Sequence, residues 1–120
     1  MTVDVKRLIL EFQYSEKIKS QLIIGSSLLA QVEALKGEER TGAEKILKTY
    51  LQSLLTEIRI AQSTVRSVNY HGAEKNVLES LGRLEMNDLA KSNLCMSKAL
   101  SYITTACEAA MTTLQKGNFL

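Results

Sequence analysis

The chain has 120 residues, of which 45% are hydrophobic and 23% are charged. This composition excludes a highly charged disordered polypeptide and is typical of a chain that folds around a hydrophobic core. The 15 basic and 13 acidic residues leave a formal net charge of +2, so charge alone gives little reason to expect a polyanionic partner.

A chain of this length is expected to form one domain, residues 1–120. It contains no proline and only 5% aromatic residues, whereas Leu, Ala, Lys and Glu, which lose little entropy in helices, are abundant. We therefore predict an all-α fold, an antiparallel helical bundle that is either complete in one chain or completed by oligomerisation. Its three to four helices are expected at about 3–36, 42–70, 73–86 and 88–116.

The first predicted helix has an unusually wide apolar face. Its apolar positions spread over about 160°, more than the ~100° stripe of a helix covered on one side. They are Ile18, Leu22, Ile24, Gly25, Leu28, Leu29, Val32 and Leu35. We expect this helix to contact at least two neighbours. Gly25 costs about 1 kcal/mol relative to alanine in a helix, and close approach of a neighbouring helix would offset that cost.

A second group of apolar residues lies near the start of the same helix, on a different side. The group consists of Val5, Leu8, Ile9 and Phe12. If the helix is continuous, they are rotated by about a quarter turn or more from the wide face. They are expected to pack either over the end of the bundle or on another subunit. The predicted partner or oligomer face consists of these four residues together with Ile24, Leu28 and Leu35.

The second predicted helix begins after Thr41, where Thr41-Gly42-Ala43-Glu44 matches a capping box. Apolar residues then recur in steps of four and three, which places them in one stripe along a helix. They are Leu47, Leu51, Leu54, Ile58, Ala61, Val65 and Val68. The stripe predicts a seam against another helix. The helix is expected to end near Tyr70, because Gly72 can adopt the left-handed conformation that terminates helices.

Two further helices are predicted after Gly72. A short apolar face is followed by a longer stripe that is out of phase with it. The short face has Val77, Leu78, Leu81 and Leu84, and the long stripe has Met96, Leu100, Ile103, Cys107, Ala110 and Leu114. Asn87 or Asp88 can cap a new helix at the join. We predict separate helices at about 73–86 and 88–116, the second ended by Gly117 and Asn118, with one bent helix as the alternative.

No residue pattern predicts catalysis, a cofactor or a metal. Nucleophilic catalysis needs a base near a serine or cysteine, and the single histidine, His71, is expected in a turn beside Gly72. The Glu-x-x-His pairs of helical di-iron sites and the glycine-rich loops that hold phosphates do not occur. We therefore expect no enzyme, no catalytic, cofactor-binding or metal-binding residues, and no cofactor.

The cysteines indicate a cytoplasmic protein. Cys95 and Cys107 are expected about 18 Å apart on one helix, too far for a disulfide, whose Cα atoms lie within about 7 Å. Both are therefore expected to be reduced. The longest apolar stretch, Leu22 to Ala30, has less than half of the ~20 residues that span a bilayer, and Glu11 interrupts the apolar start before a signal-peptide core forms. We expect no membrane partner.

Two functional hypotheses follow from the sequence, because a helical bundle alone identifies no function. The main hypothesis is a non-enzymatic helical interaction or assembly module, such as an adaptor, chaperone-like or scaffold protein. It would act through apolar helix faces as a homo-oligomer or with a protein partner. The alternative is a nucleic-acid-associated accessory protein, because aligned cations on the second helix suit a polyanion. These cations are Lys45, Lys48, Arg59 and Arg66.

Overall fold

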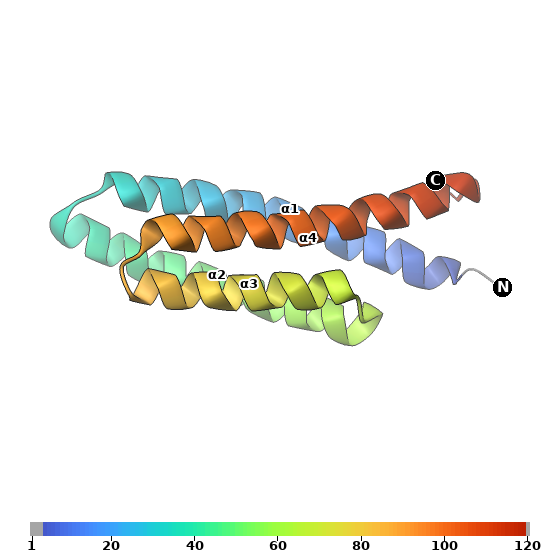
Figure 1. Ribbon diagram of the computed structural model, residues 1–120, viewed down its shortest axis with the longest axis horizontal. Coiled ribbons are helices and arrows are strands. Elements are labelled where there is room, and N and C mark those ends of the chain that lie inside the picture. Colours follow the sequence, from blue (N-terminus) through green and yellow to red (C-terminus); the bar gives the residue numbers. More distant parts are fainter. Residues whose placement is uncertain (1–3, 120) are drawn as a thin grey trace.

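A computed structural model describes residues 4–119 of the chain and is helical almost throughout. Four helices follow one another: α1 (Val5–Ala34), α2 (Gly37–Val65), α3 (Val68–Glu85) and α4 (Leu89–Lys116). Turns of two or three residues join them, so successive helices run antiparallel (Figure 1). The predicted helical bundle is confirmed, with four helices in an elongated body of 57 × 21 × 18 Å.

The helices pack in a ring around the core. Both α1 and α3 pack against α2 and α4, and α4 makes the more extensive contacts. The predicted seams of α2 and α4 form this core, apart from the half-buried Leu100 and the exposed Val68. The seam residues that are buried are Leu47, Leu51, Leu54, Ile58, Ala61 and Val65 in α2, and Met96, Ile103, Cys107, Ala110 and Leu114 in α4.

Gly25 explains how α1 meets two neighbours at once. A Cβ atom added to this glycine would lie 2.8 Å from Met96 Cε of α4 and 3.3 Å from Tyr50 Cε1 of α2. The glycine therefore leaves room for side chains from both helices to meet over the middle of α1. The prediction that the wide apolar face touches at least two helices is confirmed.

The predicted start of α2 is wrong. The helix begins at Gly37, whose φ of +62° is a conformation that glycine adopts readily. Thr41 does not cap the helix, because its hydroxyl donates to the carbonyl oxygen of Gly37 one turn earlier at 3.2 Å. Glu44 instead accepts a hydrogen bond from Arg40 Nε at 3.2 Å. The capping-box motif therefore lies inside the helix, where its side chains make other contacts.

The predicted end of α2 is also wrong. The helix ends at Val65, and Arg66 takes the left-handed conformation with a φ of 55° that the sequence suggested for Gly72. Ser67 then caps α3 by accepting the backbone N–H of Asn69 at 3.2 Å. His71 and Gly72 consequently lie within α3 and not in a turn. Gly72 serves close packing, because an added Cβ would lie 2.6 Å from the ring of Tyr102.

The break between α3 and α4 is confirmed, and one continuous bent helix is excluded. Asn87 is left-handed with a φ of 59°, and the Asp88 carboxylate accepts the backbone N–H of Lys91 at 3.1 Å. The observed bounds differ from the predicted ones by one residue at this break, and Gly117 ends α4 as expected. The predicted start of the first helix, residue 3, lies outside the described residues.

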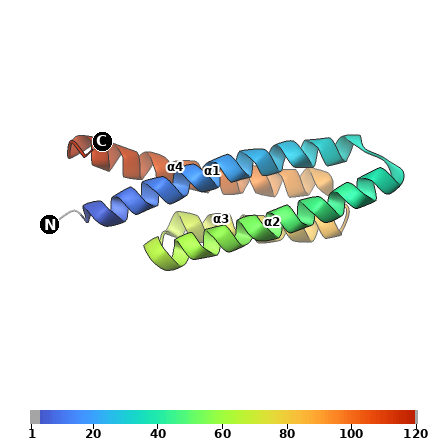
Figure 2. The ribbon, with the colours of Figure 1, turned by 180° about the vertical axis from the view of Figure 1, so that it is seen from behind.

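The helices are staggered, so two ends of the bundle contain fewer than four helices. With 18 residues, α3 is much shorter than α1, α2 and α4, which have 28 to 30. Figures 1 and 2 show the turn between α1 and α2 projecting beyond the turn between α3 and α4. At the opposite end, the start of α1 and the last turns of α4 project beyond the other two helices. Side chains near both ends therefore have fewer neighbours.

Candidate protein-interaction surface

The outward side of α1 carries an uncharged surface. No charged residue occurs from Ser20 to Val32, a run of 13 residues, although helix surfaces that face water usually carry charges. Ile23 and Ile24 are each 50% exposed within this run. We call its exposed residues the α1 outer face: Ser20, Ile23, Ile24, Ser27, Leu28, Ala30 and Gln31.

An apolar groove borders the α1 outer face where α1 meets α2. It encloses about 140 Å³ and is lined almost entirely by apolar atoms. Ile46 of α2 is its most exposed apolar residue, at 72%. The residues that line it are Leu28, Gln31, Val32 and Leu35 of α1, and Ala43, Ile46 and Leu47 of α2. The groove and the α1 outer face share Leu28 and Gln31, so they form one continuous surface.

Charge and aromatic contacts limit this surface toward the start of α1. Lys17 Nζ lies 3.2 Å from Glu57 Oε2 of α2, so the same α1–α2 seam is bridged by an ion pair farther along. Between that pair and the groove, the Tyr50 hydroxyl donates to the carbonyl oxygen of Gln21 at 2.6 Å. These contacts hold α2 against α1. The apolar part of the α1–α2 seam therefore lies nearer the turn that joins the two helices.

The structure divides the predicted partner face into two separate regions. Ile24, Leu28 and Leu35 lie together at the surface just described, with Ile24 and Leu28 exposed and Leu35 half-buried. The other four, Val5, Leu8, Ile9 and Phe12, are half-buried at the opposite end of α1. Figures 1 and 2 show the last turns of α4 beside that end of α1.

Ile23, Ala43 and Ile46 belong to this surface but were not among the residues predicted from the sequence. Ile23 stands between positions assigned to the wide apolar face, and Ala43 and Ile46 precede the first residue of the predicted α2 stripe. A signal was present, because Ile46 and Ile60, which are 14 positions apart, stand on a side of α2 whose intervening residues Thr49, Ser53 and Thr56 are polar. The uncharged run from Ser20 to Val32 was the stronger signal, and hydrophobic spacing alone does not reveal it.

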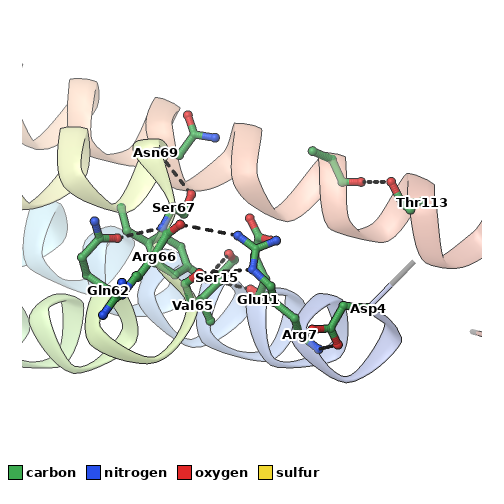
Figure 3. A network of polar contacts seen from close by, with 12 residues as sticks. Asp4, Arg7, Glu11, Ser15, Gln62, Val65, Arg66, Ser67, Asn69 and Thr113 are labelled. Carbon is green, nitrogen blue, oxygen red and sulfur yellow. Dashed lines mark hydrogen bonds and ion pairs between the residues drawn. The ribbon is translucent and has the colours of Figure 1, made fainter. Parts of the chain in front are cut away.

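A polar network holds the start of α1 against the turn between α2 and α3 (Figure 3). Arg7 Nε donates to the carbonyl oxygen of Val65 at 3.2 Å, and Arg7 Nη2 donates to that of Arg66 at 3.4 Å. Asp4 caps α1 by accepting the backbone N–H of Arg7 at 3.0 Å. Burial raises the pKa of Glu11, which lies 3.9 Å from Arg7 Nη1. The network satisfies carbonyl groups at the end of α2 and thus fixes the turn.

The four predicted polyanion contacts do not form one stripe of free cations. Lys45 is exposed and Lys48 is half-buried on α2. Arg59 Nε lies 3.5 Å from Glu74 Oε2 of α3, so its charge is paired within the bundle. Arg66 lies beyond the end of α2. Binding of a polyanion to these residues stays a prediction from the sequence.

The two cysteines are buried, free thiols. Cys107 Sγ donates a hydrogen bond to Glu16 Oε1 at 3.0 Å, and burial together with that carboxylate raises the pKa of Cys107 to about 11. Burial also raises the pKa of Cys95. Both groups are therefore protonated near neutral pH, where a thiol is a weak nucleophile and a weak metal ligand.

Another cleft, of about 400 Å³, lies between α3 and α4 and exposes polar and apolar atoms to a similar extent. Its lining residues include Lys75 and Glu79 of α3 and Lys98 and Tyr102 of α4. Residues of both charges thus line the same cleft, and neither cysteine lines it. Among residues 4–119, no three His, Cys, Asp or Glu side chains are arranged to hold a metal ion.

Comparisons with known protein families, with curated proteins and with solved structures found no match. None of the four helices described here has a stretch that is long and apolar enough to cross a membrane.

Proposed function

We propose that this protein is a non-enzymatic helical assembly module that binds protein through the α1 outer face and the adjoining groove, as a homo-oligomer. The observation that carries the proposal is the uncharged run on α1 with two half-exposed isoleucines. Contiguous apolar surface of this kind is typical of sites where proteins associate. Burying the exposed half of an isoleucine side chain contributes about 1 kcal/mol, so a few such residues can drive association.

The position of the surface also supports an assembly role. The side chains of the α1 outer face are exposed, so a partner can contact them without displacing core side chains. Its serines, alanine and glutamine are short or uncharged, so burying them carries a smaller desolvation cost than burying lysine or glutamate. The surface therefore suits helix-to-helix packing.

We further propose that the protein works in the cytoplasm. The support is that both cysteines are free and buried, and that their raised pKa values keep the thiols protonated. A reducing compartment keeps such thiols unpaired.

The test is the molar mass in solution, measured by light scattering after size exclusion over a wide concentration range. Wild-type protein is expected to be oligomeric, and Ile24→Asp is expected to be monomeric. Leu78→Asp is the matched control, because Leu78 is 51% exposed on α3, away from the proposed surface. It should remain oligomeric. Circular dichroism checks that each variant folds. A folded Ile24→Asp variant with wild-type mass would contradict the proposal.

A further inference from the structure

The α1 outer face is apolar along the edge that borders α2. Ile24 and Leu28 are four residues apart, so they lie on nearly the same side of the helix, and Leu28 lines the groove beside α2. Ser27 lies nearly opposite the buried Gly25, because two residues correspond to a rotation of about 200°. The face therefore has an apolar edge beside α2 and a small residue along its centre.

Two opposite charges bracket the uncharged run. Lys19 precedes it and Glu33 follows it. They are 14 positions apart, which places them within about 40° of each other around the helix. Lys19 lies on the edge of α1 that borders α4, because its amine pairs at 3.3 Å with Glu16, and Glu16 also accepts the hydrogen bond from Cys107 of α4.

Glu33 has no ionic partner within residues 4–119 and is exposed, whereas Lys19 has only the surface pair within its own helix. Surface pairs between residues three apart contribute a few tenths of a kcal/mol, so Lys19 can exchange this partner at little cost. An acidic side chain of a binding partner on the same edge of α1 can replace Glu16 as the ionic partner of Lys19. A basic group is the natural partner for Glu33.

We propose that the α1 outer face binds a second copy of this chain, with the two α1 helices antiparallel about a two-fold axis level with residue 26. The inference rests on the proposed assembly function and names its partner. In this arrangement, residues equally distant from position 26 in opposite directions lie opposite each other. Ile24 then packs on Leu28 of the second copy, and Lys19 faces Glu33 of the second copy. Two-fold symmetry makes each contact twice.

The same geometry argues against a parallel pair. A parallel two-fold arrangement would set the α2 edge of one copy against the α4 edge of the other, so Ile24 and Leu28 would face Lys19 and Glu33 and neither group would gain a matching partner. The antiparallel arrangement also brings the two Ser27 residues close to the axis, where small side chains let the helices approach. Antiparallel helices in addition oppose their macrodipoles favourably.

Disulfide trapping tests the register directly. Two single variants, Ile24→Cys and Leu28→Cys, are oxidised mildly, each alone and mixed in equal amounts. The antiparallel pair predicts that the mixture forms covalent dimers at least tenfold faster than either variant alone. Wild-type protein is the control for the native thiols, both of which are buried. Fast trapping of either variant alone, or a mixture that is trapped no faster than the single variants, would overturn the inference.

Charge reversal tests the flanking contacts without changing the apolar ones. Lys19→Glu alone and Glu33→Lys alone each create two like-charge pairs and should weaken the dimer about fivefold or more. The double variant Lys19→Glu/Glu33→Lys should return the Kd to within about twofold of wild type, because the reversed charges face each other again. Single variants without effect, or a double variant weaker than either single variant, would overturn the proposed register.

These outcomes separate the inference from the function on which it rests. If Ile24→Asp abolishes association but the mixture is trapped no faster than the single cysteine variants, the surface is correct and the antiparallel arrangement is wrong. If Ile24→Asp leaves the oligomer intact and no cysteine variant is trapped, both are wrong. If Ile24→Asp abolishes association and the mixed variants are trapped, both stand.

Discussion

The hydroxyl of Tyr70 lies 2.8 Å from Ser15 Oγ, across the diagonal of the bundle, where it joins α3 to α1. The Tyr70 hydroxyl also donates to the carbonyl oxygen of Glu11 at 2.8 Å, so the Ser15 hydroxyl donates to Tyr70. Both side chains are fully buried. The pair sits beside the turn that the sequence analysis misplaced, and it connects that turn to the start of α1.

Tyr70→Phe should lower the free energy of unfolding by about 1–2 kcal/mol, because it leaves a buried hydroxyl and a carbonyl group without a partner. Urea denaturation followed by circular dichroism measures the loss. The double variant Ser15→Ala/Tyr70→Phe should lose less than the sum of the two single variants, because each removes the same hydrogen bond. Strictly additive losses would show that the two hydroxyl groups are not coupled.

The Cys107 thiol should make the protein less stable at alkaline pH. Its pKa is raised from 9.0 to about 11 in the folded chain, so below pH 9 the thiol is protonated in both states and has no effect. Between pH 9 and about 11, the unfolded thiol ionises and the folded thiol does not, so stability falls as pH rises.

Urea midpoints at pH 8 and pH 10 test this expectation. Cys107→Ser is the control, because serine can donate to Glu16 in the same way and does not ionise in this range. The wild-type midpoint should fall more than that of the variant between the two pH values. Equal falls in both proteins would show that Cys107 does not cause the alkaline loss.

Two glycines should respond oppositely to substitution. Gly82→Ala on α3 should stabilise the protein by about 0.5–1 kcal/mol, because alanine favours the helix and nothing lies within 4 Å of an added Cβ. Gly25→Leu should destabilise it by about 2–3 kcal/mol, because the larger side chain would overlap Met96 and Tyr50. Thermal unfolding measures both changes. A stabilised Gly25→Leu variant would contradict the close packing of α1 with its two neighbours.

Arg66→Gly should stabilise the chain by about 0.5–1 kcal/mol. The φ of 55° at Arg66 disfavours a residue with a Cβ, and glycine has no such penalty. The Arg66 carbonyl, which accepts from Arg7, is a backbone group and is kept by the substitution. Chemical denaturation would measure the gain, with Arg59→Gly inside α2 as a control that should lose stability. A loss at both positions would contradict the left-handed conformation of Arg66.

The spacing of apolar residues predicted which sides of the helices form the core, because burial of a stripe depends mainly on local helical geometry. Helix ends were harder to predict, because tertiary contacts decide them. Gly72 looked like a helix stop, but the close packing of Tyr102 explains it and Arg66 makes the turn. Val68 continued the stripe in sequence yet is 86% exposed, because the helix has already ended and the chain has turned.

The candidate surface was predicted only in part, because tertiary contacts decide which apolar residues stay exposed. Ile24 and Leu28 have the spacing of core residues, and only the number and placement of neighbouring helices leave them exposed. Ile46 meets Leu28 across the groove because of the α1–α2 register, which no local pattern contains. The lack of charge between Ser20 and Val32 is visible in the sequence and distinguishes this surface from an ordinary helix exterior.

The most direct measurement of the proposed contact surface is the NMR chemical shift of each isoleucine methyl group as protein concentration rises from micromolar to millimolar. The methyl groups of Ile24 and Ile46 should shift together with the increase in molar mass, while those of the buried Ile58 and of the exposed Ile60 on α2 should stay constant. Unchanged Ile24 and Ile46 methyl groups in a protein whose mass increases would show that the chain associates through a different surface.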